Sequence, residues 1–259
     1  MSFCYKLSAI FLGISFLLLG INAVSAEEHS WYIKKRGNDL PGFPSNAEMM
    51  SAFNAYYVDN DAFEKGEKVI YLTFDAGYEN GNISKILDTL KEENVPAAFF
   101  LLDNIILKNT DLVKRMTKEG HTVCNHTKRH KNLCSATKEE IERDLSELET
   151  VYKNATGETM SKYFRFPEGK YSMESLKTIS ELGYKTIFWS FGYEDWDNSH
   201  QPDIEKSKNK ILSNTHNGEI LLLHPTSETN AIILGDLIKE WRKEGYTFGT
   251  LDQLVERNS

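Results

Sequence analysis

The sequence contains few cysteines. Cys4, Cys124 and Cys134 are the three among its 259 residues, and Cys4 lies inside an N-terminal targeting segment. One pair therefore remains in the exported chain. Export permits a disulfide between Cys124 and Cys134, but two cysteines ten positions apart in a loop are equally well interpreted as free thiols. The sequence leaves both alternatives open.

The sequence also lacks an excess of positive charge. Its 30 Lys and Arg residues are outnumbered by 38 Asp and Glu residues, which gives a formal net charge of −8. Such an acidic chain is poorly suited to nonspecific binding of nucleic acid, and we expect no nucleic-acid partner. Repeats and low-complexity stretches are absent. The hydrophobic fraction of 40% is sufficient for the core of one ordinary domain.

One long hydrophobic run is present, at the N-terminus. Lys6 is the only charged residue before an almost wholly apolar run over 7–24, and residues 24–26 form a small-x-Ala cleavage pattern. We therefore predict a signal peptide over 1–26 and a mature chain that begins at Glu27, outside the cytoplasmic membrane. The run is at the short end for a membrane span, so an uncleaved anchor is the alternative. A Leu-x-Gly-Cys pattern for lipid attachment is missing.

After a polar lead segment over 27–67, apolar runs alternate with segments in which apolar residues have helical spacing. The expected strands are 69–74, 97–102, 122–125, 163–166, 186–191, 219–223 and 246–248. The expected helices are 83–93, 111–119, 137–154, 173–182, 204–214 and 231–244. This alternation predicts an α/β fold over 68–259 with a parallel sheet closed into a barrel, whose chemistry gathers at the carboxyl ends of the strands.

Six polar residues with catalytic or ligating chemistry fall at the ends of the expected strands. They are Asp75, His126, His130, Arg165, Asp195 and His224. Residues so scattered in sequence would converge on one mouth of a barrel, and this coincidence carries more weight than any single residue. Asp75 and His224 follow apolar strands and are placed for a general base and a general acid. Each also has a structural interpretation, as a helix cap and a core histidine, and Arg165 with Asp195 could be an ordinary ion pair.

Two of these residues, His126 and His130, lie four positions apart. If the segment forms one helical turn, both imidazoles lie on one face and can share a metal ion. Two unrelated surface histidines are the commoner meaning of this spacing. The chain has no His-Glu-x-x-His motif, so a zinc protease of that type is excluded because its general base is missing.

Five short motifs resemble, in order, those of the polysaccharide deacetylases, the NodB-homology group or carbohydrate esterase family 4. They are Thr73-Phe-Asp-Ala-Gly77, His126-Thr-Lys-Arg-His130, Arg165-Phe-Pro-Glu-Gly169, Asp195-Trp196 and Leu222-Leu-His-Pro225. The resemblance implies a deformed (β/α) barrel with about seven parallel strands and a divalent metal ion, expected to be zinc. The segments 30–35, 71–81 and 188–190 also resemble the spore-cortex subgroup, which deacetylates muramic acid on the way to muramic-δ-lactam.

The resemblance also implies roles for individual residues. Asp75 matches the general base and His224 the general acid, while His126 and His130 match the metal ligands. Arg165 matches the residue that holds the base. Asp195 matches the residue that tunes His224 or Arg165.

One position departs from the family pattern. Ala76 stands where most members have a second aspartate that binds metal, and a methyl group cannot ligate a metal ion. The departure puts tight metal binding and the identity of the metal in question. If another side chain completes the site, Glu79 and Asn80 are the first candidates.

The expected substrate is an amino sugar in the glycan strands of peptidoglycan, met in the cell wall or the spore intermembrane space. A cationic cluster near the expected mouth comprises Lys128, Arg129, Lys131 and Lys170. Arg129 is the first choice for binding the lactyl carboxylate of muramic acid, because arginine binds carboxylates through two hydrogen bonds. A free carboxylate requires prior removal of the peptide by a muramoyl-alanine amidase.

Two alternatives to muramic acid deacetylation remain at this stage. The first is a deacetylase of N-acetylglucosamine in peptidoglycan or chitin oligomers. The second is a pseudoenzyme that binds glycan without cutting it, with Trp189, Tyr193 and Trp196 as sugar platforms. Retention of an acid and a base argues against the pseudoenzyme, because a binding module has no need of them.

Overall fold

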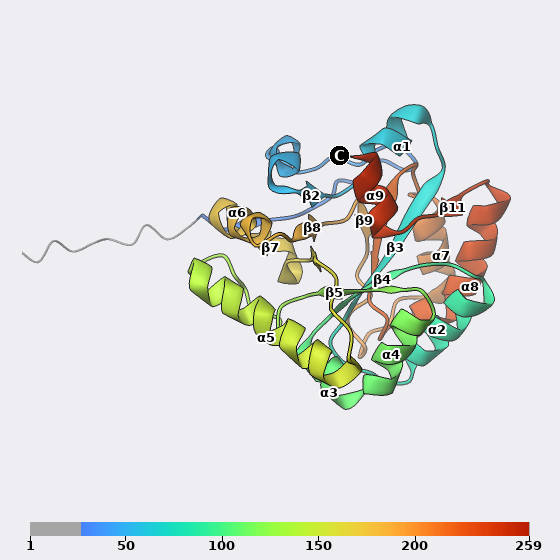
Figure 1. Cartoon of the computed structure of the whole chain (residues 1–259). Coiled ribbons are helices and arrows are strands. Elements are labelled where there is room, and N and C mark those ends of the chain that lie inside the picture. Colours follow the sequence, from blue (N-terminus) through green and yellow to red (C-terminus); the bar gives the residue numbers. More distant parts are fainter. Residues whose placement is uncertain (1–26, 259) are drawn as a thin grey trace, which may run out of the picture.

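A curled parallel sheet forms the centre of the molecule (Figure 1). The computed structural model describes residues 27–258, so the predicted signal peptide lies outside the described residues. The strand order is β2 (Ala55–Tyr56), β8 (Lys185–Ile187), β6 (Tyr163–Phe164), β5 (Thr122–Asn125), β4 (Ala98–Leu101), β3 (Val69–Ala76), β10 (Glu219–Leu223) and β9 (Phe191–Gly192), and β11 (Thr247–Phe248) pairs with β3. The sheet curls into a half-barrel with helices around its outside.

The expected parallel α/β architecture is confirmed, with differences in the number and bounds of the strands. The strands at 122–125 and 219–223 have the expected bounds, and β3 extends past Asp75 to Ala76. Over the described residues, 27–258, the sheet has nine strands instead of about seven. One additional strand arises because the run expected at 186–191 divides into β8 and β9, and the other is β2 from the lead segment.

The helices largely follow the expected apolar spacing. They are α1 (Asn60–Lys65), α2 (Asn82–Glu92), α3 (Asp103–Lys108), α4 (Thr110–Lys118), α5 (Lys138–Thr156), α6 (Met173–Glu181), α7 (Ile204–Leu212), α8 (Glu228–Lys243) and α9 (Leu251–Arg257), with 3₁₀ helices η1 (Ala47–Phe53) and η2 (Pro167–Gly169). At the start of α5, Thr137 and Glu140 form the expected capping box. The sequence interpretation missed α1, α3 and α9, which are only six or seven residues long.

The side chains of β3 alternate between the two faces of the sheet, as strand geometry requires. Ile70, Leu72, Phe74 and Ala76 belong to the large core that lies against the outer helices. Thr73 and Asp75 point to the opposite, inner side, where both contact Arg165. The alternation therefore places Asp75 inside the barrel, while the neighbouring Ala76 is packed in the outer core with 1% of its surface exposed.

The segment 185–192 connects the two sides of the curled sheet. β8 pairs with β2 and β6, whereas β9 pairs with β10 at the other end of the strand order. Between them, the amide of Phe188 donates to Tyr56 O at 2.8 Å, and the amide of Ser190 donates to Ile220 O at 3.0 Å. We call this segment the seam. Because it changes pairing partners midway, it cannot be one continuous strand.

The lead segment packs against the seam. Strand β1 (His29–Ser30) forms a separate antiparallel pair with β7 (Lys170–Tyr171). The indole of Trp31 stacks on Phe188 with 4.5 Å between ring centroids and donates a hydrogen bond from Nε1 to Trp189 O. These contacts give the lead segment a direct role in holding one wall of the barrel mouth.

The described part of the chain contains neither a membrane-spanning helix nor a disulfide bond. Within residues 27–258, none of the helices has the length and hydrophobicity needed to span a membrane. Cys124 and Cys134 are both buried free thiols. Of the two alternatives that the sequence left open for this pair, the structure therefore has the free thiols.

Candidate active site

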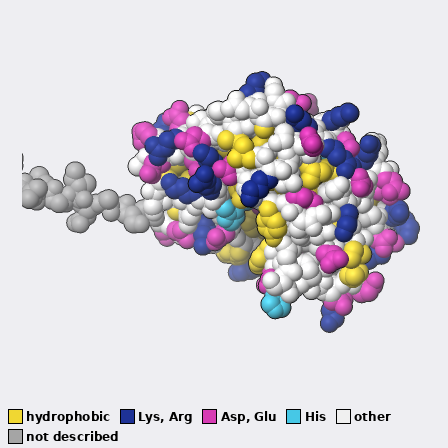
Figure 2. Space-filling view, turned by 90° about the horizontal axis from the view of Figure 1, so that it is seen from below, with side chains coloured by type: hydrophobic (Ala, Val, Ile, Leu, Met, Phe, Trp, Pro, Cys, Tyr) yellow, Lys and Arg dark blue, Asp and Glu magenta, His cyan; other side chains and the backbone are white. Residues whose placement is uncertain are grey.

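A pocket of about 650 Å³ lies at the carboxyl ends of the strands. Its lining residues come from the ends of several strands and from the segments that follow them: Asp75, His130, Glu168, Gly169, Trp189, Trp196, Leu222 and His224. Figure 2 shows a face on which a histidine and several hydrophobic side chains surround a hollow, between regions dense in charged side chains. A mostly apolar pocket with a few convergent ionisable groups is the usual form of a small-molecule site.

Asp75 is held by the fully buried Arg165. The Arg165 guanidinium donates to Asp75 Oδ1 at 2.8 Å and to Thr73 Oγ1 at 2.9 Å. Its other hydrogen bonds go to two seam carbonyls, Ile187 O at 2.8 Å and Phe188 O at 3.3 Å, and its plane lies 4.2 Å from the centre of the Phe100 ring. Arg165 thus fixes the orientation of the Asp75 carboxylate and satisfies backbone groups that the seam leaves unpaired.

His126 lies beside Asp75 with a defined tautomer. Its Nδ1 is 2.9 Å from Arg165 O, and since a carbonyl only accepts, Nδ1 carries the proton. The unprotonated Nε2 is then 3.5 Å from Asp75 Oδ2. Burial lowers the pKa of His126 to about 4, so the ring is neutral at physiological pH. A neutral imidazole oriented through its other nitrogen is the form that binds metal ions.

His130 approaches His126 without the helical turn considered from the sequence. The segment 126–132 is a loop, and the two imidazole rings lie 5.1 Å apart at 73°. Thr127 and His130 have positive φ angles of 65° and 57°. The amide of Thr127 donates to Asn125 Oδ1, and Thr127 Oγ1 accepts from Lys131 N. Side-chain hydrogen bonds to the backbone therefore hold the strained loop in which the two rings meet.

His224 is held on the opposite wall by Asp195. His224 Nδ1 lies 2.7 Å from Asp195 Oδ1, and its amide donates to Asp195 Oδ2 at 2.8 Å. The fully buried Asp195 also accepts from Asn230 Nδ2 at 2.6 Å. Because Nδ1 is directed at a carboxylate, it carries a proton, and Nε2 is free to exchange a proton in the pocket.

The surroundings shift the pKa values of Asp75 and His224 in opposite directions. Burial raises the pKa of the Asp75 carboxyl, but the positive charge of Arg165, together with that of a protonated His224, outweighs burial and lowers it below its usual value. Burial lowers the pKa of His224, but the hydrogen bond and charge of Asp195, with Asp75 adding to them, outweigh burial and raise it. The surroundings thus favour an ionised carboxylate at Asp75 and a protonated imidazole at His224.

The four residues expected to bind substrate take different positions. Trp196 lines the pocket, and its ring meets that of His224 edge-on, with 5.9 Å between centroids. Tyr193 is buried and donates its hydroxyl to Asn230. Lys128 is paired with Glu147 at 2.7 Å, and Arg129, with 78% of its side chain exposed, lies 3.3 Å from Asp103. Neither cation is among the residues that line the pocket.

The structure adds residues that the sequence interpretation missed. Glu168 and Leu222 line the pocket, and Asn230 supports Asp195 from the first turn of α8. Glu168 has a φ of 56°, uncommon for a residue other than glycine, and its carboxylate pairs with Lys170 at 2.6 Å. The sequence signal for Glu168 was its place inside the Arg165 motif. For Asn230 no sequence signal pointed to the site.

The site offers two imidazoles and one aspartate that could contact a metal ion. Within residues 27–258, no three His, Cys, Asp or Glu side chains are grouped closely enough to hold one. Glu79 and Asn80, the residues considered for completing the metal site, form other hydrogen bonds in the structure. Both Glu79 carboxylate oxygens accept backbone amides at the start of α2, from Gly81 and Ile83, and Asn80 donates to Thr226 O.

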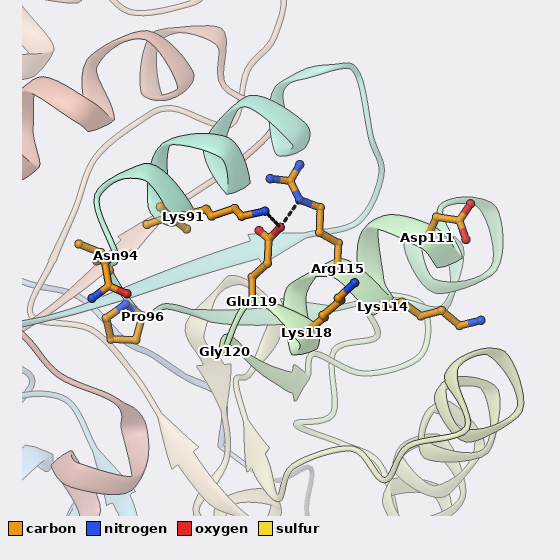
Figure 3. A pocket seen from close by; sticks show the side chains of 11 residues that line it. Lys91, Asn94, Pro96, Asp111, Lys114, Arg115, Lys118, Glu119 and Gly120 are labelled. Carbon is orange, nitrogen blue, oxygen red and sulfur yellow. Dashed lines mark hydrogen bonds and ion pairs between the residues drawn. The ribbon is translucent and has the colours of Figure 1, made fainter.

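A larger pocket of about 800 Å³ lies elsewhere, between α2 and α4 (Figure 3). Pro96 and Gly120, which line it, precede β4 and β5, so this pocket is at the amino ends of the strands. Its walls are charged, and Glu119 accepts from Lys91 and Arg115, as the dashed lines show. It contains none of the residues expected to carry chemistry, and size alone therefore does not identify the active site.

Asp75 and His224, each paired with a buried partner of opposite charge, face one pocket at the mouth of the barrel, and comparison with known proteins identifies the family of this chain. Residues 63–187 match the family model described as polysaccharide deacetylase. The chain is 38% identical over 237 residues to the peptidoglycan-N-acetylmuramic acid deacetylase PdaA of Bacillus subtilis strain 168, covering 90% of this chain and 88% of that protein. The chain belongs to the polysaccharide deacetylase family, carbohydrate esterase family 4, whose members hydrolyse N-acetyl amide bonds.

Solved structures and a second relative extend the comparison. The structure of Bacillus subtilis PdaA superimposes with a TM-score of 0.84 at 34% identity, covering 90% of this chain and 99% of that one. A peptidoglycan-N-acetylglucosamine deacetylase of Bacillus cereus is 33% identical over 73% of this chain and 89% of its own length. A family pseudoenzyme from Bacillus anthracis, BA3943, has a TM-score of 0.69 at 25% identity, covering 78% of this chain and 68% of that one.

Proposed function

We propose that this protein removes the acetyl group from N-acetylmuramic acid in peptidoglycan strands, outside the cytoplasmic membrane. The observation that carries the catalytic part is the pairing of Arg165 with Asp75 and of Asp195 with His224 across one pocket. The muramic acid assignment is supported by the similarity to PdaA over nine-tenths of the chain.

The Arg165-held carboxylate of Asp75 accepts the proton of the attacking water. Arg165 keeps this carboxylate ionised and fixes its orientation, and the hydrogen bond from Thr73 to Leu221 O fixes the neighbouring part of β3. A carboxylate that is both charged and immobile needs no reorganisation before it accepts a proton.

His224 delivers the proton that the leaving nitrogen requires. Asp195 keeps Nδ1 protonated and raises the pKa of the ring, while Nε2 is left for the pocket. The water oxygen forms a bond to the amide carbon as Asp75 takes the water's proton, and the C–N bond breaks as His224 Nε2 gives its proton to the leaving nitrogen. The products are acetate and a free amine on the sugar. The Asp195 carboxylate stabilises the charged imidazolium before transfer.

We also propose that His126 and His130 hold a divalent metal ion, zinc being the expected one. Two nitrogen donors are available, because Arg165 O fixes the His126 tautomer so that Nε2 faces Asp75, and the His130 ring lies alongside. A bound divalent cation would polarise the amide carbonyl. With Ala76 packed in the outer core, the site has no second carboxylate, and we expect weak retention of the metal.

Zinc binding should depend on His130. We expect His130→Gln to lower zinc affinity about tenfold or more, since one of two nitrogen ligands is lost. Isothermal titration calorimetry measures this, and the absorption spectrum of the Co²⁺-substituted protein gives a second readout that does not require activity. His200→Gln, which changes an exposed histidine bound to Asp197, is the control. Equal zinc affinity of the native and His130→Gln proteins would place the metal elsewhere.

Muramic acid differs from glucosamine by a lactyl group, which bears a free carboxylate when the peptide has been removed. Since Lys128 and Arg129 are paired with Glu147 and Asp103, binding this carboxylate requires one of them to exchange partners. Arg129 is largely exposed and its contact is long at 3.3 Å, so exchange costs little. Deacetylation then leaves an amine beside the lactyl carboxyl on one ring, at high effective concentration for lactam closure.

Substrate preference should favour peptide-stripped peptidoglycan over chitin. We expect faster acetate release from muramic-containing strands than from chitin oligomers of equal length. An enzymatic acetate assay measures the rates, and mass spectrometry of the products identifies the sugar that changed. Equal or faster release from chitin would remove the muramic assignment and leave the deacetylase assignment standing. In cells, the same preference would place this protein after a muramoyl-alanine amidase in spore-cortex formation.

The competing function is glycan binding without hydrolysis, and the chain is similar to one protein described as a pseudoenzyme of this family. Ala76 is the feature that favours this alternative. The intact Asp75–Arg165 and Asp195–His224 pairs favour hydrolysis, because their opposed pKa shifts serve proton transfer and not stacking. Acetate release from any wall glycan separates the two functions.

A further inference from the structure

Two aromatic rings are exposed on loops beside the active-site pocket. Trp196, which lines the pocket, is 57% exposed, and Tyr78, in the loop between β3 and α2, is 46% exposed. The Tyr78 hydroxyl accepts a hydrogen bond from Asn198 Nδ2, two residues beyond Trp196. The two rings therefore belong to loops that are directly joined, although they are more than a hundred residues apart in the sequence.

The loop that carries Tyr78 is held on several sides. Asn104 of α3 donates to Gly77 O at 3.1 Å, and Asn80 donates to Thr226 O, next to the loop that carries His224. Glu79 accepts two backbone amides of its own loop and helix. The loop is thus fixed by side-chain hydrogen bonds, while the aromatic ring between its anchors remains exposed.

The loop that carries Trp196 is held in the same manner. Gln201 accepts from the Ser227 hydroxyl at 2.8 Å and from Thr229 N at 3.2 Å, and Asp197 accepts the amide of Ser199. The loops at 77–81, 194–202 and 224–227, with the start of α8, are therefore cross-linked into one rim beside His224. A rigid rim that exposes large rings binds at a low entropic cost, because the side chains are already ordered.

We propose that Tyr78 and Trp196 form an outer sugar subsite, which binds the unit of the glycan strand next to the one being deacetylated. The C–H groups on one face of a pyranose ring form an apolar surface that stacks on aromatic rings, and the Tyr hydroxyl and Asn198 supply polar contacts at the edge. Trp196 meets His224 edge-on, so a strand that leaves the pocket beside His224 passes over Trp196 toward Tyr78. The subsite selects polymers over single sugars and rests on the proposed glycan substrate.

The test is the affinity for a tetrasaccharide relative to a disaccharide of peptide-stripped peptidoglycan, measured by isothermal titration calorimetry. We expect the native protein to bind the longer strand more tightly, and Tyr78→Ala to reduce this preference about five- to tenfold, since one stacked ring is lost. Calorimetry needs no turnover, so the result does not depend on acetate release. Absence of acetate release with a retained length preference would overturn the proposed reaction alone.

Two matched variants separate stacking from a structural role of Tyr78. Tyr78→Phe and Asn198→Ala both break the hydrogen bond between the loops but keep the ring. If the ring binds sugar, these variants keep most of the length preference that Tyr78→Ala loses. Ile232→Ala, which removes an exposed hydrophobic side chain from α8, should change nothing. An unaltered preference in Tyr78→Ala, or an equal loss in Tyr78→Phe, would overturn the outer subsite.

Discussion

Asp75→Asn and His224→Ala should each reduce acetate release by about 100- to 10,000-fold, the usual contribution of a general acid or base. Asparagine keeps the shape of Asp75 but cannot take a proton, and alanine removes the only proton donor that Asp195 holds toward the pocket. Initial rates on peptide-stripped peptidoglycan measure the effect. Circular dichroism and thermal unfolding establish that both variants remain folded.

The matched control for the carboxylate is Asp236→Asn. Asp236 is an exposed aspartate of α8 that pairs with Lys208, so its change should leave the rate unaffected. Near-native acetate release by Asp75→Asn or by His224→Ala would remove the acid–base mechanism. Combining the two changes should cost less than the product of the separate losses, because both groups serve one reaction.

Replacing Arg165 should have the largest effect on stability. Arg165→Met leaves the buried Asp75 carboxylate unpaired and deprives the carbonyls of Ile187 and Phe188 of their donor. Removing one partner of a buried ion pair costs about 3–5 kcal/mol. For a domain of this size the corresponding fall in Tm is on the order of 10 °C, and differential scanning calorimetry measures it.

A double variant distinguishes the ion pair from simple loss of packing. If the unpaired charge is the cause, Arg165→Met combined with Asp75→Asn should be more stable than Arg165→Met alone. Arg242→Met is the control, because Arg242 is partly exposed and forms a surface pair with Glu93 that contributes about 1 kcal/mol or less. A fall in Tm as small as that of the control would show that Arg165 does not hold the barrel mouth together.

Local sequence was sufficient to predict the bounds of elements that have a helix cap or a clear pattern of apolar residues. The strand at 219–223 had the expected bounds because Gly218, with a positive φ, precedes it and His224 follows its apolar residues. Helix α5 began at the expected capping box. The positions of Asp75 and His224 at strand ends followed from the same patterns. In a parallel sheet these ends share one edge, and the structure places both residues in one pocket.

Local sequence was not sufficient to predict structure where a residue's conformation or contacts depend on residues far away in the sequence. The run 186–191 has the composition of one strand, yet β8 and β9 pair with opposite sides of the sheet. His126 and His130 meet through a loop with positive φ angles and not through a helical turn. Lys128 and Arg129 lie between His126 and His130 in the sequence and were therefore expected to bind substrate. In the structure, Lys128 pairs with Glu147 and Arg129 with Asp103.

The sequence by itself was sufficient to predict the family of this protein and the alternation of its longer strands and helices. Hydrophobic periodicity and strand-end residues are local properties, so they can be read without a fold. The tertiary structure alone decided which side of β3 faces the barrel interior, and therefore that Asp75 meets Arg165 while Ala76 packs in the outer core. It also decided that Tyr78 joins Trp196 on one rim. These facts depend on contacts between distant segments, which come together only when the sheet curls and buries its two faces.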